Sequence, residues 1–120
     1  MPADAKPQYW IVLTTCPSKG SANKLAALLL KARLCACVQI SSKIRSHYWW
    51  KGRLEKAQEY QLWIKTRADL WPKLQKTISQ HHPFDVPEII GIPMGGGNAA
   101  YLNWIDRETL AKSPLKKRKI

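Results

Sequence analysis

The stretch Trp50-Lys51-Gly52-Arg53 is typical of a tight β-hairpin turn, because glycine readily adopts the positive φ that such a turn requires. After the turn, Tyr60, Leu62 and Ile64 alternate with mostly polar residues, as in a strand with one buried face. Before it, an apolar run over residues 34–40 leads into a long extended segment. These features predict a long hairpin in the middle of the chain.

Two further strands are expected on either side of this hairpin. Residues 9–15 are nearly all apolar, aromatic or β-branched, which indicates a buried first strand that Pro17 ends. Residues 87–93 indicate a fourth strand. The sequence therefore predicts a sheet of four strands.

Three segments carry apolar residues at helical spacing. The first begins after Ser18 or Ser21, either of which can cap it. The second covers residues 69–80 and ends before Pro83, and the third is a short helix that Asn98 can cap. The order is that of the ferredoxin-like split βαβ arrangement, so we expect an α+β fold, βαββαβ, with an overlong central hairpin and a short C-terminal helix.

The hairpin arms are longer than a four-stranded sheet of this size needs. Tyr48, Trp49 and Trp50 lie near the tip, where the hairpin's own sheet cannot cover them. Exposed apolar surface of this kind on an overhanging hairpin indicates contact with another subunit. We therefore expect an oligomer.

The length of 120 residues suits one domain, and we divide the chain into an N-terminal extension (1–8), a folded domain (9–108) and a basic tail (109–120). The net charge is +12, and five of the twenty Lys and Arg lie in the last nine residues. We expect this tail to be disordered and to attract polyanions only non-specifically. With no long apolar run and no signal peptide, we expect a cytoplasmic protein without membrane contact.

No sequence motif of a known catalytic site is present. The chain lacks a P-loop, a GxSxG elbow, an HExxH helix and a dinucleotide-binding fingerprint. The thiols of Cys16, Cys35 and Cys37 are expected to be reduced, and no neighbouring sequence activates them. We therefore do not expect an enzyme.

Two pairs of residues could nevertheless carry chemistry. The imidazoles of His81 and His82 suit copper, zinc or nickel, but both can bind one ion only if the helix unwinds there. Alternatively, one histidine caps the helix and the other is exposed. Glu59 and Glu88 lie on predicted strands and could serve as acid and base, or could simply pair with nearby cations such as Lys65 or Arg67.

Several motifs, in this order and spacing, resemble the CutA family of divalent-cation-tolerance proteins, and the resemblance covers roughly residues 9–106. It implies a ferredoxin-like fold and a tight homotrimer in which long hairpins pair between subunits. It also implies a link to the tolerance of copper and other divalent metals, and an architecture similar to the trimeric PII signalling proteins. The motifs are Ala36-Cys37-Val38, Tyr48-Trp49-Trp50-Lys51-Gly52, Glu59 with Lys65-Thr66, His81-His82-Pro83-Phe84 followed by Pro87-Glu88, and Tyr101-Leu102-Asn103-Trp104.

The resemblance also implies a metal site and a ligand cleft. The proposed copper ligands of the family are a first-strand thiol and two histidines, here His81 and His82. Thr14 stands in the place of that thiol, and Cys16, two residues further on the same strand face, could substitute for it. We expect weak binding of Cu²⁺ or another divalent metal at this site. The cleft between subunits is expected to contain Cys37, Trp50, Glu59, Lys65, His82 and Glu88.

These observations predict a trimeric CutA-like protein that responds to metal ions and binds a metal, a small ligand or both in its intersubunit cleft. One alternative is an enzyme whose carboxylate-lysine site is formed by Glu59, Lys65 and Glu88. Others are a PII-like signalling module, or a module that binds polyanions through its tail.

Overall fold

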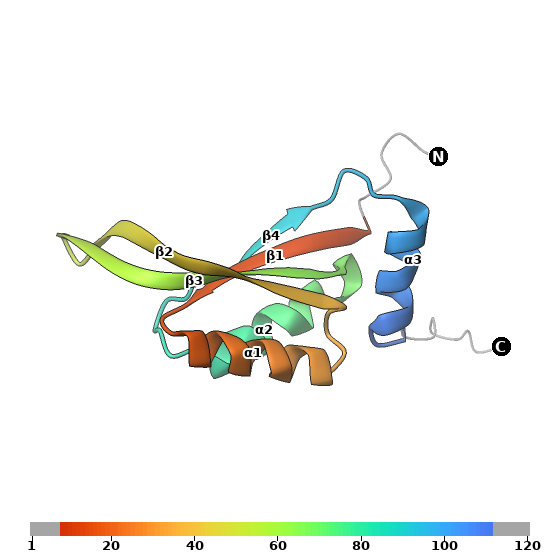
Figure 1. Ribbon diagram of the computed structural model, residues 1–120, viewed down its shortest axis with the longest axis horizontal. Coiled ribbons are helices and arrows are strands. Elements are labelled where there is room, and N and C mark those ends of the chain that lie inside the picture. The colour runs from red at the N-terminus through yellow and green to blue at the C-terminus, as the bar shows by residue number, and fades with distance from the viewer. Residues whose placement is uncertain (1–7, 112–120) are drawn as a thin grey trace.

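The computed structural model describes residues 8–111 and confirms an α+β architecture. The strands form one antiparallel sheet in the order β2-β3-β1-β4, and α1 and α2 cover one of its faces (Figure 1). Helix α3 lies at the end of the sheet opposite the hairpin tip. The elements are β1 (Tyr9–Cys16), α1 (Lys19–Lys31), β2 (Cys37–Trp50), β3 (Arg53–Arg67), the 3-10 turn η1 (Ala68–Leu70), α2 (Trp71–His81), β4 (Ile90–Pro93) and α3 (Ala99–Glu108).

Most of the predicted N-terminal extension and basic tail lies outside the described residues. Within residues 8–111, no helix is both long and apolar enough to cross a lipid bilayer.

Helix α1 begins at a capping box that uses both of the serines considered from the sequence. The Ser18 hydroxyl accepts a hydrogen bond from the backbone N–H of Ser21 at 3.0 Å, and the Ser21 hydroxyl accepts one from the N–H of Ser18 at 3.2 Å. Each bond satisfies a backbone donor that the helix itself leaves unpaired.

The core lies between the sheet and the two long helices. Leu29 of α1 and Leu74 of α2 are fully buried against Val12, Leu62 and Ile64 of the central strands. Burial of each such side chain stabilises the fold by about 1.5–3 kcal/mol. This packing holds α1 and α2 on the same face of the sheet.

The second strand begins later than the apolar run over residues 34–40 predicts. Arg33 has a φ of 58°, and the Leu34 N–H donates to the Leu29 carbonyl at 3.1 Å, as in a Schellman motif that ends a helix. Leu34 is then buried beneath the end of α1 instead of joining the sheet. The fourth strand is also shorter than predicted, so Glu88 lies in the loop before it.

The predicted hairpin turn is confirmed. Lys51 and Gly52 have φ values of 50° and 77°, and this pair of positive values is typical of a two-residue type I′ turn. Strand β1 pairs with β3 only as far as the pair Cys16–Tyr60, so among the described residues the rest of the hairpin has no third strand. This part of the hairpin extends from the body of the molecule (Figure 1). The longest dimension of the molecule, with the hairpin included, is 57 Å.

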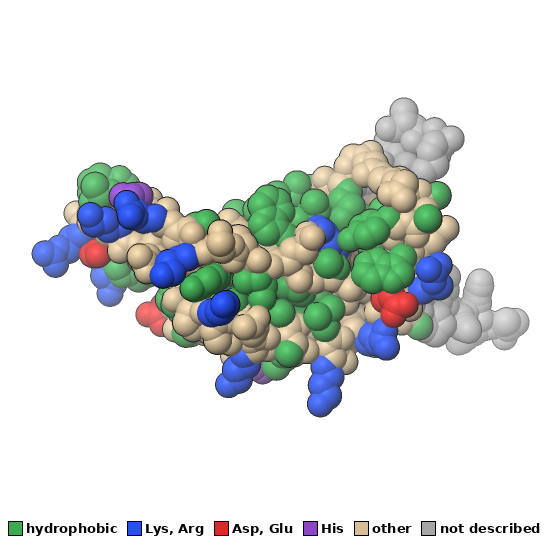
Figure 2. Space-filling view, viewed as in Figure 1, with side chains coloured by type: hydrophobic (Ala, Val, Ile, Leu, Met, Phe, Trp, Pro, Cys, Tyr) green, Lys and Arg blue, Asp and Glu red, His purple; other side chains and the backbone are tan. Residues whose placement is uncertain are grey.

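The free end of this hairpin is apolar. Trp49 and Leu54 are cross-strand partners, and their side chains are 72% and 65% exposed. Figure 2 shows hydrophobic side chains gathered there among Lys and Arg. An isolated two-stranded ribbon is at best marginally stable in water, and an exposed apolar surface of this kind is typical of a contact surface.

Adjacent leucines of α1 provide a test of the packing. Replacing the buried Leu29 by alanine should lower the free energy of unfolding by about 2–5 kcal/mol, because it leaves a cavity in the core. Leu30→Ala is the matched control, since Leu30 is 39% exposed and should cost within about 0.5 kcal/mol. Guanidinium unfolding at equal protein concentration measures both. Equal losses would show that the outer face of α1 is also covered.

Candidate functional site

A cavity of about 600 Å³ lies where β1 ends, between the free part of the hairpin and the loop that follows α2. Thr15 at the end of β1 forms part of its wall, with Ser46 to Tyr48 and Trp50 from β2 and Glu59 from β3. The loop contributes Pro83 to Val86 together with Glu88. Three segments that are distant in sequence therefore enclose one pocket.

His82 fastens the loop to β1. Its Nε2 lies 2.7 Å from the carbonyl oxygen of Thr15, and its Nδ1 lies 3.1 Å from the backbone nitrogen of Phe84. A carbonyl can only accept and an amide N–H can only donate, so the ring is neutral and carries its proton on Nε2. The ring also packs against Phe84, at 4.9 Å between centroids. These contacts position the loop wall of the pocket.

The two glutamates of the pocket have different surroundings. Glu88 accepts a hydrogen bond from the side-chain amide of Gln61 at 3.3 Å. Glu59 is only 8% exposed, and its carboxylate has no hydrogen bond or ion pair among residues 8–111. The suggested pairing of these glutamates with Lys65 or Arg67 is not found there either. Lys65 donates to Gln39 at 2.7 Å and Arg67 binds Asp69.

Within one chain, the predicted cleft residues fall into two groups. Trp50, Glu59 and Glu88 line the pocket, and His82 fastens its wall. Cys37 and Lys65 are cross-strand partners at the opposite end of the hairpin. A site that contains both groups, including the carboxylate-lysine site considered as an alternative, therefore needs more than one chain.

The proposed metal ligands are not assembled as a group in one chain. Cys16 is 1% exposed in the core, and this burial raises the pKa of its thiol, which disfavours the thiolate that a metal requires. Both ring nitrogens of His82 are already hydrogen-bonded. Among residues 8–111, no group of three or more His, Cys, Asp or Glu side chains could hold a metal ion.

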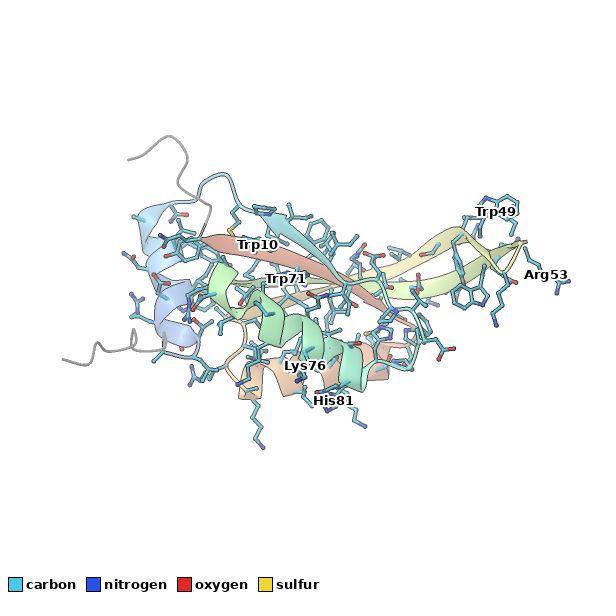
Figure 3. The ribbon with its side chains drawn as sticks, turned by 180° about the vertical axis from the view of Figure 1, so that it is seen from behind. Trp10, Trp49, Arg53, Trp71, Lys76 and His81 are labelled. Atoms are coloured by element: carbon cyan, nitrogen blue, oxygen red, sulfur yellow. The ribbon has the colours of Figure 1, made fainter. Side chains whose placement is uncertain are left out.

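His81 is the one member of this set with an available ring nitrogen. Its Nδ1 donates to the Thr77 carbonyl at 3.0 Å, and its Nε2 has no hydrogen bond among residues 8–111. Figure 3 shows His81 at the end of α2, away from the hairpin tip that carries Trp49. The side chain is exposed and does not line the pocket.

The other thiols and Thr14 lack features of a reactive site. Burial raises the pKa of Cys35 to about 12, so its thiol stays protonated. Cys37 is partly exposed, and all three cysteines are free. The hydroxyl of Thr14, where the resemblance places a thiol, is buried without a hydrogen-bond partner among the described residues.

Sequence reasoning missed several residues of the pocket. Thr15 and His47 carried no signal, because their role depends on where β1 stops relative to the hairpin. Asp85 had a weak signal, since an acidic residue directly after His82-Pro83-Phe84 lies in a short loop that must turn back toward the sheet. Recognition of these residues required the tertiary contacts.

The chain matches the model of the family described as CutA1 divalent ion tolerance protein over residues 10–108. It is 44% identical to the divalent-cation tolerance protein CutA of Pyrococcus horikoshii over 99 aligned residues. This alignment covers 82% of this chain and 96% of that protein. The crystal structure of CutA1 from Oryza sativa has a TM-score of 0.85 at 37% identity, and covers 90% of this chain and 98% of that one. The crystal structure of CutA1 from Shewanella sp. SIB1 has a TM-score of 0.86 at 34% identity, and the match covers 89% of this chain and 100% of that one.

The two adjacent histidines should differ sharply in their effect on stability. His82→Ala removes both hydrogen bonds that hold the loop and should lower the free energy of unfolding by about 1–3 kcal/mol. His81→Ala removes an exposed contact within one helix and should change it by about 0.5 kcal/mol or less. Chemical denaturation measures both, and hydrogen exchange at Phe84 should speed up only in His82→Ala. Equal effects would contradict the anchoring role of His82.

Proposed function

Because the chain belongs to the CutA1 family of divalent ion tolerance proteins, we propose that it acts as a homotrimer that binds a divalent metal or a small ligand between subunits. The observation that carries this proposal is the overhanging hairpin with its exposed apolar end. The hairpin leaves the cleft incomplete in one chain, since Cys37 and Lys65 lie far along it from Trp50.

The exposed apolar side chains favour assembly. Burial of side chains such as Trp49 and Leu54 contributes about 25 cal/mol for each Å² removed from water. A second apolar row crosses the sheet on the face opposite α1 and α2, where Trp63, Ile90 and Ile92 are 41%, 47% and 40% exposed. Pairing of hairpins around a threefold axis would cover the tips and this face together.

Assembly would also bring the two groups of cleft residues together. The pocket at the free part of one hairpin holds Trp50, Glu59 and Glu88. Cys37 and Lys65 of a neighbouring subunit could complete it if the hairpins cross at that point. An enzymatic carboxylate-lysine site would need this same arrangement, but the curated relatives carry the names of tolerance proteins.

Metal binding is proposed to be weak and to involve the two histidines more than Cys16. His81 offers an exposed imidazole, whereas His82 must give up a hydrogen bond to bind an ion. Cys16 would have to leave the core and lose a proton, although burial raises its pKa. A role in the response to metal ions then rests on modest affinity for copper or a similar cation.

Light scattering over a wide range of dilution should give three times the mass of the chain. Replacing both Trp49 and Leu54 by serine should weaken the assembly, because it removes the apolar end of the hairpin. The midpoint of unfolding should rise with protein concentration, as for any obligate oligomer. A monomer that persists at high concentration with native tryptophan fluorescence would contradict the proposal.

Copper(II) titration by calorimetry tests the ligands. The double variant His81→Ala/His82→Ala should lose most of the binding, because paired imidazoles are the best copper ligands near the loop. Cys16→Ala, studied under the same conditions, should bind nearly as the unchanged protein does. The assignment is wrong if the cysteine variant loses binding and the histidine variant keeps it.

A further inference from the structure

The pocket beside the hairpin has a charge opposite to that of the chain. The sequence holds twenty Lys and Arg against eight Asp and Glu, with a net charge of +12. Within residues 8–111, the pocket wall contains three of those carboxylates, on Glu59, Asp85 and Glu88, and neither lysine nor arginine. A locally acidic cavity in a basic protein favours a cationic ligand over an anion.

Glu59 is the strongest sign of such a ligand. It lines the pocket, is 8% exposed and has no hydrogen bond or ion pair among the described residues. A carboxylate that lines a cavity with unused acceptor sites can receive a cation or hydrogen-bond donors there. Its neighbour Glu88 does have a donor, in Gln61. The unused carboxylate of Glu59 is therefore available to a cation that enters the pocket.

The aromatic side chains of the pocket favour an organic cation. Tyr48, Trp50 and Phe84 line the same pocket, and aromatic faces attract ammonium and guanidinium groups. The Trp50 ring already has the Lys51 ammonium at 5.8 Å from its centre, an example of this contact. By contrast, the described residues contain no cluster of three side chains that could hold a metal ion. The wall thus suits a charged group attached to an apolar body.

We propose that this pocket binds a small organic cation, an ammonium or guanidinium on an apolar body, with Glu59 as the carboxylate that receives the charge. The cavity of about 600 Å³ is of the size that encloses small molecules. This inference deepens the proposed function, since it names a ligand class for the pocket part of the intersubunit cleft. The same charged group could come from the Lys or Arg side chain of a neighbouring subunit, and the experiment separates the two sources.

Calorimetry on the full chain, with 2-phenylethylammonium as the probe, tests the ligand class. The neutral 2-phenylethanol has the same shape and should bind at least tenfold more weakly, because it cannot pair with Glu59. Glu59→Gln keeps the size of the side chain and should weaken binding of the ammonium by tenfold or more. Glu55→Gln is the matched control, since Glu55 lies on the same strand, is exposed and does not line the pocket.

Equal binding of the alcohol and the ammonium, or unchanged binding by Glu59→Gln, would overturn the inference.

The unfolding midpoint of the ligand-free protein identifies the source of the cation. Glu59→Gln should leave it unchanged, because the carboxylate has no hydrogen bond or ion pair among the described residues of the ligand-free chain. If the variant is instead less stable and no probe binds, a cation of a neighbouring subunit fills the site, and the small-molecule ligand is excluded.

Light scattering and copper titration on the same samples keep this test separate from that of the proposed function. A trimer that binds copper but not the ammonium would overturn only the inference. A monomer that binds the ammonium through Glu59 would overturn the trimer and support the inference.

Discussion

The partial pairing of β3 is the constraint on which the rest of the structure depends. Strand β3 pairs with β2 along most of its length but with β1 only from Tyr60 to Arg67. Within that range Leu62 and Ile64 are buried in the core, and beyond it Leu54 is exposed. Pro17 follows directly after the end of β1 and has no N–H to extend the ladder. The free hairpin and the pocket both begin at this point.

The charged side chains near the two ends of the paired part of β3 differ in their hydrogen-bond partners. Arg67, at the base, is 2% exposed and donates hydrogen bonds to Asp69, Thr109 and the carbonyl of Leu110. The hydrogen bonds to Asp69 raise the pKa of Arg67, so its charge is retained and fastens the end of α3. Glu59, next to the other end, is 8% exposed and has no such partner among residues 8–111. A fully paired charge stabilises the fold, whereas a carboxylate with unused acceptor sites remains available for binding.

Much of the fold could be predicted from local patterns. The alternation around Leu62, the helical spacing around Leu25 and the glycine of the turn each depend on a few neighbouring residues. The predicted second strand was wrong for residues 34–36. Arg33 adopts the αL conformation that ends the helix, and Leu34 is then buried in the core instead of joining the sheet. The individual site residues were harder to place, since Cys37 and Trp50 belong to one strand yet lie at its opposite ends.

The sequence by itself determined the order of the elements, the Gly52 turn, the capping of α1 and the excess of apolar residues at the hairpin tip. Periodicity and turn chemistry act over a few residues, so they can be seen without coordinates. Only the tertiary structure decided the tautomer of His82, the isolation of Glu59 and the acidic character of the pocket. These depend on contacts between distant segments, such as that of His82 with Thr15, 67 residues away, which no local spacing encodes.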